Sequence, residues 1–481
     1  MLNSDAIIAL ATPTGAGAIG VIRISGENAI SLVDPFFKSV RNKKLVNQKT
    51  HTVHLGNIVD GELTLDEVLV SVFKSPNSYT GENVIEISCH GSPYIQQQVI
   101  QLFLRNGCRT ADAGEFTLRA FLNCKMDLSQ AEAVADLIES DNAASHQIAI
   151  QQMRGGFSNE IKELRAELLN FASLIELELD FSEEDVEFAD RTQFKALLTR
   201  IQQVLKRLID SFAVGNVIKN GIPVAIVGEP NVGKSTLLNA LLNEERALVS
   251  EIAGTTRDTI EDEISIGGIG FQFIDTAGIR KTEDVVEEMG IQRTFEKIEK
   301  AQVVLYLLDS TGLIPHQAPS ILDISPERGE KLPSLIEIEK IREGYPSKTV
   351  VVVVNKIDQI SENEKANINV ILSAIEGIQV QMLSAKTKTG IENLQSKLLE
   401  FVNTGALKNN DTIITNTRHY DALLKALEEV EKVQFGMAAG VSGDLLAIDI
   451  RQALFHFGEI TGEITSDDLL GNIFANFCIG K

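Results

Sequence analysis

The sequence predicts a multidomain protein of mixed α/β and all-α class, in which a P-loop domain is inserted into a split helical domain and preceded by an α+β domain. Three observations lead to this prediction. A phosphate-binding motif lies near the middle of the chain, between an apolar run and a helical pattern. Segments with helical periodicity flank it on both sides. Short β-rich segments separated by turns occupy the first part of the chain.

Periodicity also gives the expected domain boundaries. Residues 1–120 alternate β-rich segments with turns, so we expect the α+β domain there. Residues 121–217 and 405–481 place apolar side chains at three- and four-residue spacing. Both helical parts are amphipathic, so each needs the other to bury its apolar face. Residues 218–404 form the inserted domain, in which 313–348 is expected to be a surface loop with one short helix.

The motif GEPNVGKS, Gly228 to Ser235, follows the apolar run Ile222 to Val227 and precedes a helical pattern. In that setting the glycines let backbone N–H groups surround the β-phosphate of a nucleotide. Lys234 supplies a positive charge, and the Ser235 hydroxyl ligates Mg²⁺. A chance glycine-rich turn is the alternative, and the flanking strand and helix argue against it. The predicted nucleotide-binding residues here are Asn231, Val232, Gly233, Lys234, Ser235 and Thr236.

Two later motifs indicate which nucleotide is bound. The run Val350 to Val354 is typical of a central parallel strand, and it ends in Asn355-Lys356-Ile357-Asp358. A carboxylate at that point accepts hydrogen bonds from the guanine N1–H and exocyclic amine, a pair that adenine lacks. Ser384-Ala385-Lys386 follows another short apolar stretch and fits a loop over the base. The predicted ligand is therefore GTP, bound here by Asn355, Lys356, Asp358, Ser384, Ala385 and Lys386.

Two further segments are expected around the γ-phosphate. Asp275-Thr276-Ala277-Gly278 follows an apolar run, so that Asp275 can hold Mg²⁺ through water and the Gly278 N–H can meet the phosphate. Thr255 and Thr256 lie in an upstream loop, where Thr256 is the better candidate ligand of Mg²⁺. Ile279 follows Gly278, at the point where familiar GTPases carry a Gln that orients the attacking water. This chain must therefore stabilise the transition state in another way.

Composition limits the possible functions. The net charge of −23 disfavours a broad basic surface for nucleic acid, so any RNA contact has to be local or shared with a partner. The four cysteines have no C-x-x-C spacing, which argues against a zinc site and a disulfide framework. No apolar run reaches the roughly 18 residues that a membrane span requires, and the N-terminus lacks the features of a targeting peptide. This profile predicts a cytoplasmic protein without membrane contact.

The chain ends in a helical pattern that leads into Cys478-Ile479-Gly480-Lys481. One interpretation is a helix end with a buried structural cysteine. The other is a thiol nucleophile or acid–base group on a flexible tail, with the charge of Lys481 nearby. Spacing alone does not decide between the two interpretations.

Long motifs are spread over the whole chain: SYTGENVIEISCHG (78–91), AGEFTLRAFLNCKMDLSQAEAVADLI (113–138), GEPNVGKS, IAGTTRD (252–258), DTAGIR (275–280) and EITGEITSDDLLGNIFANFCIGK at the end. Together they resemble the bacterial MnmE/TrmE family of tRNA-modification GTPases. Because they cover all three regions, the resemblance is far more specific than one to a G domain alone. Cys124 stands where the family is variable, and residues 313–348 do not align.

The resemblance implies that Asn231 is a side-chain ligand of K⁺, with the backbone carbonyls of Ser250 and Ile252 and with Thr255 completing the shell. The charge of the ion would act where other GTPases use an arginine finger. It also implies that the G domains pair across the nucleotides of a homodimer and that Glu287 orients the water through a second water. From the residues alone, Glu287 is a solvated carboxylate in an acidic cluster.

For the N-terminal domain, the resemblance implies tetrahydrofolate binding and dimerisation. Arg23, Glu86 and Lys125, with Lys481 from the tail, would contact a 5,10-methylene or 5-formyl derivative. Such contacts make chemical sense, because Glu86 can accept from the pterin amine and N–H while the basic groups suit the glutamate tail. From sequence alone, a structural ion pair is equally plausible for Arg23 and Glu86.

The implied function is addition of a carboxymethylaminomethyl or aminomethyl group to C5 of the wobble uridine of certain tRNAs. An FAD-dependent partner of the MnmG (GidA) type would join in a heterotetramer or larger assembly, and FAD would enter only through that partner. GTP hydrolysis would drive a conformational cycle, and Cys478 would take part in the modification. Two alternatives stay open: a regulatory GTPase in RNA or ribosome maturation, and a stand-alone folate-dependent transferase with purely regulatory GTP.

Overall fold

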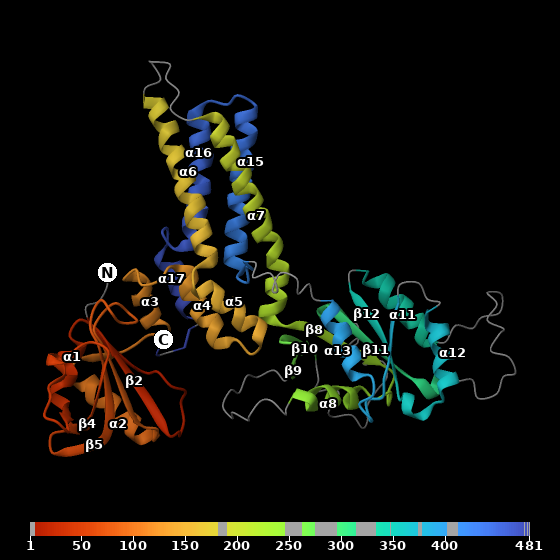
Figure 1. Cartoon of the computed structure of the whole chain (residues 1–481), viewed down its shortest axis with the longest axis horizontal. Helices are drawn as coiled ribbons and strands as arrows, with labels where there is room; N and C mark the ends of the chain where they lie inside the picture. The colour runs from red at the N-terminus through yellow and green to blue at the C-terminus, as the bar shows by residue number, and fades with distance from the viewer. Residues whose placement is uncertain are drawn as a thin grey trace. The chain divides into compact units, whose positions relative to one another are not determined.

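The computed structural model describes residues 5–180, 190–245, 262–274, 296–313, 333–346, 348–373, 378–401, 412–475, 477–478 and 480. It divides into two compact units. The first comprises Met1–Glu139, Ala149–Arg207 and Thr417–Lys481, and the second comprises Ser140–Ile148 and Leu208–Asn416. Figure 1 shows a sheet domain and a helical bundle in the first unit, and a sheet flanked by helices in the second. The predicted fold class is confirmed.

A seven-stranded sheet forms the N-terminal part of the first unit, in the order β3-β4-β5-β6-β2-β1-β7. Neighbouring strands are antiparallel except for β1 and β7. The strands are β1 (Ala6–Leu10), β2 (Ile19–Ser25), β3 (Phe37–Ser39), β4 (Thr52–Asp60), β5 (Leu63–Phe73), β6 (Val84–His90) and β7 (Cys108–Thr110). One face of the sheet buries alternate apolar side chains against α1 (Ala29–Val33) and α2 (Pro93–Arg105).

The opposite face of this sheet carries exposed apolar side chains. Ile19, Val53, Leu55 and Leu69 are 65%, 61%, 48% and 46% exposed. Leu55 on β4 lies directly opposite Leu69 on β5. Because side chains alternate along a strand, these residues share the face opposite α1 and α2, which we call the open face, although Phe116 packs against Ile7 and Ala9 of β1 on it. Single exposed apolar residues are ordinary, but a group of them on one sheet face is typical of a surface that another protein covers.

Helices from both sides of the insertion form the bundle of the first unit. They are α3 (Glu115–Leu122), α4 (Leu128–Glu139), α6 (Gly156–Asp180), α15 (Thr417–Ala438), α16 (Gly443–Thr461) and α17 (Asp467–Ala475), with the part of α5 (Ala143–Met153) from Ala149 on and the part of α7 (Arg191–Asn220) up to Arg207. Helix α16 packs against both α15 and α6, and Figure 1 shows α6, α7, α15 and α16 side by side. The two helical parts therefore bury each other's apolar faces. Among the helices of the described ranges, none combines the length and the apolar character that a membrane crossing requires.

A buried ion cluster also joins the two helical parts. The Glu132 carboxylate on α4 accepts hydrogen bonds from Arg418 Nε at 2.9 Å and Arg418 Nη2 at 2.8 Å. His419 Nε2 lies 2.7 Å from the same carboxylate. Burial alone would raise the pKa of Glu132, but His419 and Arg418 outweigh this effect and lower it from 4.5 to about 2.

We expect this cluster to stop stabilising the bundle in acid. When folding lowers the pKa of a carboxyl group, the group adds its full contribution to the free energy of unfolding above its unfolded pKa, here 4.5. This contribution is lost as the pH falls toward the folded pKa of about 2. The melting temperatures of the wild type and of Glu132→Gln, followed by circular dichroism, should therefore differ near neutral pH and converge in that window. Glu163→Gln, at an exposed position on α6, is the control and should differ little from the wild type at any pH. A Glu132→Gln difference that is independent of pH would contradict the prediction.

A six-stranded sheet of order β13-β12-β11-β8-β10-β9 forms the core of the second unit. All its pairs are parallel except that of β9 with β10. Its elements are β8 (Ile222–Gly228), α8 (Lys234–Glu245), β9 (Asp262–Ile266), β10 (Ile269–Phe273), β11 (Val303–Asp309), α11 (Pro333–Gly344), β12 (Thr349–Asn355), α12 (Glu362–Ser373), β13 (Gln379–Met382) and α13 (Ile391–Glu400). The run 350–354 is buried in β12, as predicted. Helix α11 is the short helix expected within 313–348, while 314–332 and 347 lie outside the described residues.

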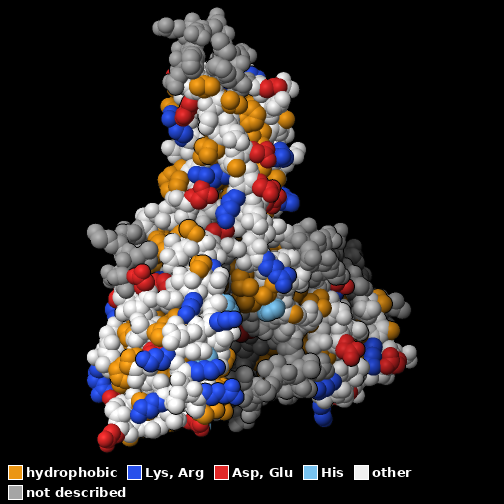
Figure 2. Space-filling model, turned by 60° about the vertical axis from the view of Figure 1, so that its left-hand side comes forward, with side chains coloured by type: hydrophobic (Ala, Val, Ile, Leu, Met, Phe, Trp, Pro, Cys, Tyr) orange, Lys and Arg blue, Asp and Glu red, His pale blue; other side chains and the backbone are white. Residues whose placement is uncertain are grey.

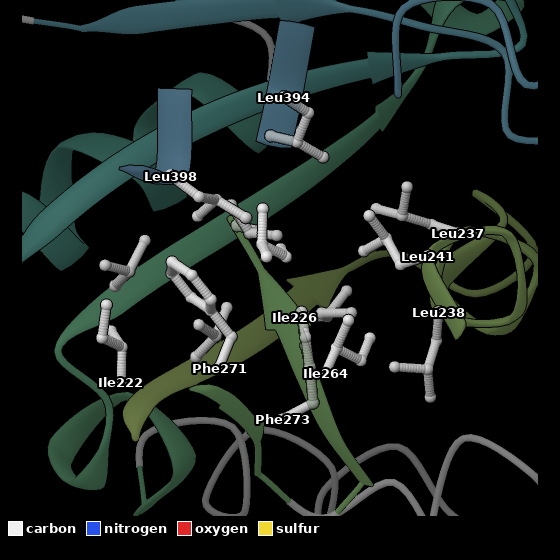
Figure 3. Close-up of a cluster of buried hydrophobic side chains, with 14 of the residues drawn as sticks. Ile222, Ile226, Leu237, Leu238, Leu241, Ile264, Phe271, Phe273, Leu394 and Leu398 are labelled. Carbon is white, nitrogen blue, oxygen red and sulfur yellow. The ribbon is translucent and has the colours of Figure 1, made fainter. Parts of the chain in front are cut away.

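Side chains from one face of this sheet pack against helices in a hydrophobic core, and the alternate side chains of the same strands form a second core. Figure 3 shows strand residues facing helix residues across the first core: Ile222, Ile226, Phe271, Leu237, Leu241, Leu394 and Leu398. Because β8, β11 and β12 are parallel and packed in this way, their carboxyl ends are fixed at one edge of the sheet. Ligands of open α/β sheets bind at that edge.

Candidate functional site

The phosphate loop connects the carboxyl end of β8 to the N-terminus of α8. Gly228, Asn231 and Gly233 have positive φ angles of 141°, 63° and 98°. A Cβ on Gly228 would lie 2.4 Å from the carbonyl oxygen of Leu307, and one on Gly233 would lie 2.3 Å from Asn355 Nδ2. Glycine is therefore a steric requirement at both positions. Asn is one of the few other residues that adopt left-handed backbone readily.

Lys234 extends back over this loop. Its Nζ donates hydrogen bonds to the carbonyl oxygens of Gly228 at 2.7 Å and Glu229 at 2.8 Å. Burial and the positive charge of Lys297 lower the pKa of Lys234, and the Glu229 carboxylate partly offsets them. A bound phosphate would add negative charge and so favour the ammonium form. The side chain is thus held where a nucleotide needs a cation.

Ser235 and Thr236 occupy the first turn of α8, where free N–H groups and the helix dipole favour anions. Other predicted ligands of GTP, Mg²⁺ or K⁺, and the predicted water-orienting glutamate, lie outside the described residues: Ser250, Ile252, Thr255, Thr256, Asp275, Thr276, Ala277, Gly278 and Glu287. The assignment of metal ligands and of Glu287 therefore stays a prediction.

Asn355 joins the phosphate loop to both predicted guanine motifs. Its side chain is buried, with Nδ2 donating to the Val232 carbonyl at 2.8 Å and Oδ1 accepting from the Ala385 N–H at 2.9 Å. Asp358 Oδ1 accepts from Ser384 Oγ at 2.6 Å. Three motifs that are far apart in sequence are therefore held together by direct hydrogen bonds. Such a frame positions the Asp358 carboxylate for the edge of a guanine.

Lys356, with a φ of 63°, forms an ion pair with Asp309 at 2.6 Å, and its carbonyl oxygen accepts from Ser310 Oγ at 3.0 Å. Burial opposes ionisation of Asp309, but Lys356 and Thr311 prevail and lower its pKa. The sequence interpretation missed Asp309 and Ser310. The apolar run 303–308, which ends in polar residues, could have revealed them, because the same pattern precedes the guanine motif. Lys386 is exposed in the loop that follows β13.

A second cluster lies on the open face of the seven-stranded sheet. Arg23 on β2 stands opposite Glu86 on β6, and its Nε and Nη2 lie 2.9 and 2.8 Å from Glu86 Oε1. The guanidinium carbon is 5.5 Å from the centre of the Tyr79 ring and 5.6 Å from that of Phe116, which is cation–π range. Sequence reasoning missed both aromatic residues, although they belong to the motifs quoted above. The cluster offers a carboxylate, a cation and the Tyr79 ring to a planar polar ligand, while the Phe116 ring is fully buried.

The C-terminal tail reaches the same cluster. The carbonyl oxygen of Gly480 accepts a hydrogen bond from Arg23 Nη1 at 3.3 Å. Two residues earlier, the carbonyl oxygen of Cys478 accepts from the Gly114 N–H at 3.5 Å, and α17 just upstream packs against α3. Cys478 is exposed, which does not fit the interpretation as a buried structural thiol. Within the first unit, the tail thus lies beside Arg23.

Lys125 is connected to this cluster through a loop. Its Nζ donates to the carbonyl oxygen of Pro76 at 2.9 Å, three residues before Tyr79 in the chain. Its hydrogen bonds within the described ranges do not include Arg23 or Glu86. The fourth predicted folate contact, Lys481, lies outside the described residues.

Comparison with known proteins places this geometry in context. A model of the MnmE helical domain matches residues 128–478, and a model of the N-terminus of the GTP-binding protein TrmE matches residues 6–125. The chain is 68% identical to the tRNA modification GTPase MnmE of Christiangramia forsetii and 69% identical to that of Flavobacterium johnsoniae. It is 51% identical to the protein of the same name from Bacteroides fragilis. Each of these alignments covers 100% of both chains.

Proposed function

The chain belongs to the MnmE family of tRNA modification GTPases, and from that premise we propose the chemistry it serves. It is a GTPase that acts in tRNA modification. We propose that it helps to add a carboxymethylaminomethyl or aminomethyl group to C5 of the wobble uridine, with a one-carbon unit from tetrahydrofolate. An FAD-dependent MnmG-type protein is the proposed partner, and the cytoplasm is the proposed compartment. Hydrolysis of GTP drives a conformational cycle, not the bond formation itself.

The observation that carries this proposal is the approach of the tail to the Arg23 cluster. A reduced pterin carries an amine and ring N–H groups that the Glu86 carboxylate can accept from, and a ring that the partly exposed Tyr79 can contact. The Gly480–Arg23 hydrogen bond brings the exposed Cys478 to within two residues of that cluster. These contacts support the proposal that folate binds in the same region of the first unit as the candidate reactive thiol.

A proposed homodimer is supported by the open face of the sheet domain. The exposed residues Ile19, Val53, Leu55 and Leu69 lie on the same sheet face as Arg23, because β2 and β5 both pair with β6 in the observed register. A second copy would cover this apolar surface and shield the folate cluster from water.

Analysis of tRNA nucleosides tests the function directly. Deleting the gene and digesting bulk tRNA should give a nucleoside profile by mass spectrometry that lacks the C5 modification of the wobble uridine, and a plasmid copy should restore it. Unchanged nucleosides would instead point to a regulatory GTPase. Normal modification in folate-depleted cells would remove the folate part of the proposal alone.

Asn231 is the proposed side-chain ligand of K⁺, whose charge would favour the transition state. We expect GTP turnover to be about a hundredfold faster in K⁺ than in Na⁺, and we expect Asn231→Gly to lose that preference. Glycine suits the φ of 63°, so the variant removes the amide oxygen without straining the loop. Steady-state turnover in the two salts and the affinity for a fluorescent GTP analogue check this. Equal wild-type rates in both salts, or a preference that survives in Asn231→Gly, would disprove the assignment.

A further inference from the structure

One segment of the sheet domain is strongly basic, although the whole chain carries a net charge of −23. Between Asp34 and Asp60 there is no carboxylate, and the segment holds five basic residues: Lys38, Arg41, Lys43, Lys44 and Lys49. This segment is therefore positively charged although the chain as a whole is negatively charged. This is the form in which an acidic protein can still offer a contact to a polyanion.

The fold brings these residues to one edge of the sheet. Strand β3, which holds Lys38, is one of the two edge strands of the described sheet and pairs with β4. The chain then turns at Asn42, where φ is 54°, and is anchored by the buried Leu45, whose N–H donates to Asp34 Oδ1. Lys74, at the end of β5, donates from Nζ to the carbonyl oxygen of Val46 at 3.0 Å. We call the surface formed by Lys38, Arg41, Lys43, Lys44, Lys49 and Lys74 the basic edge.

The positive charges of the basic edge are accessible to a ligand. Its five residues in segment 35–59 are exposed, and within the described residues none of them pairs with a carboxylate. Elsewhere in the same domain, arginines are paired with acids: Arg23, Arg105, Arg109 and Arg119. Figure 2 shows several Lys and Arg side chains on the face of the sheet domain that is turned to the viewer. Exposed, unpaired lysines on a turn keep their mobility, which suits contact with a phosphate backbone more than recognition of one fixed carboxylate.

We propose that the basic edge is a docking surface for the phosphate backbone of the tRNA substrate. The proposal rests on the proposed function, because it takes tRNA as the molecule that this chain must meet. A duplex carries one negative charge per about 1.7 Å of its axis, so closely spaced lysines release several condensed counterions at once. The contact is independent of sequence and holds the tRNA in position, while base recognition takes place elsewhere.

The test compares two triple variants of the full chain that change the charge equally. Lys43→Gln/Lys44→Gln/Lys49→Gln removes half of the basic edge. Lys195→Gln/Lys340→Gln/Lys425→Gln is the matched control, because these lysines are also exposed and lie outside the basic edge. Binding of fluorescently labelled unmodified tRNA is measured by anisotropy over a range of KCl concentrations. Thermal unfolding followed by circular dichroism shows whether each variant is folded.

We expect the first triple variant to raise the Kd for tRNA at low salt by about tenfold or more, and to reduce the slope of log Kd against log salt by about two to three. The control should stay within about twofold of the wild type. Equal affinities in all three proteins, equal losses in both variants, or no measurable binding by the wild type would overturn the proposal. So would a loss of binding to the flavoprotein partner with tRNA affinity retained. The nucleoside profile of the deletion strain separates these outcomes from a failure of the proposed function, since it does not depend on the basic edge.

Discussion

Replacing Asp358 with Asn should weaken GTP binding by about a thousandfold or more and make xanthosine triphosphate the better substrate. The carboxylate is expected to accept from two guanine donors, and the amide of Asn would place a donor against one of them. Xanthine carries a carbonyl oxygen where guanine carries its amine, so the amide restores the match. The Ser384 Oγ–Asp358 Oδ1 bond of 2.6 Å orients the group in the wild type, and an amide oxygen can still accept it.

The change of substrate preference is measured as kcat/KM for GTP and for xanthosine triphosphate, in the wild type and in Asp358→Asn. Asp309→Asn is the matched control, because Asp309 is a carboxylate at the same edge of the sheet but contacts Lys356. It should weaken both nucleotides without reversing their order. If Asp358→Asn keeps GTP as its better substrate, the base is not recognised at this carboxylate.

Gly114→Val should abolish most tRNA modification while leaving GTP turnover close to that of the wild type. A Cβ at this position would lie 2.9 Å from the Phe474 carbonyl oxygen and 2.9 Å from Phe477 Cβ, so the tail has to move away. Displacement of the tail would remove Gly480 from Arg23 and take Cys478 with it. The GTP site lies in the other unit and does not depend on this contact.

The sheet domain offers a close control for that variant. Gly61 has a φ of 63°, nearly the 64° of Gly114, but an added Cβ there would meet nothing within 4 Å. Gly61→Val therefore carries the same backbone strain without touching the tail, and it should support normal modification in a deletion strain. Modification by Gly114→Val at the level of Gly61→Val would show that the position of the tail is unimportant. Hydrogen exchange in α17 reports whether the tail has moved.

The nucleotide site was predictable because each of its motifs is contiguous and follows its own strand. Asn231, Lys234, Asn355 and Asp358 could be placed in this way from the sequence alone. Asp309 escaped notice because its role depends on the neighbouring strand in the sheet, which pairs Asp309 with Asn355 in register. Local patterns describe a strand and its end, but not which strands are neighbours.

The second cluster was accessible only through resemblance to a family. Arg23 and Gly480 are 457 positions apart, and no periodicity relates them. The aromatic rings of Tyr79 and Phe116 likewise meet Arg23 only after the sheet and α3 have packed. Sites assembled from the two ends of a chain leave no local signature in either end.

The buried cluster of Glu132 and Arg418 has a consequence for the timing of synthesis. Glu132 can form its ion pair only after Arg418, 286 residues further along the chain, has been synthesised. At about 5–20 residues per second, the ribosome needs roughly fifteen to sixty seconds to deliver it. During that interval the sheet domain can fold first and the inserted domain second. The first bundle helices meanwhile expose to water their apolar faces and the Glu132 carboxylate, which the folded protein buries. The first bundle helices therefore stay without their partners until most of the chain has been made, which gives chaperones time to bind them.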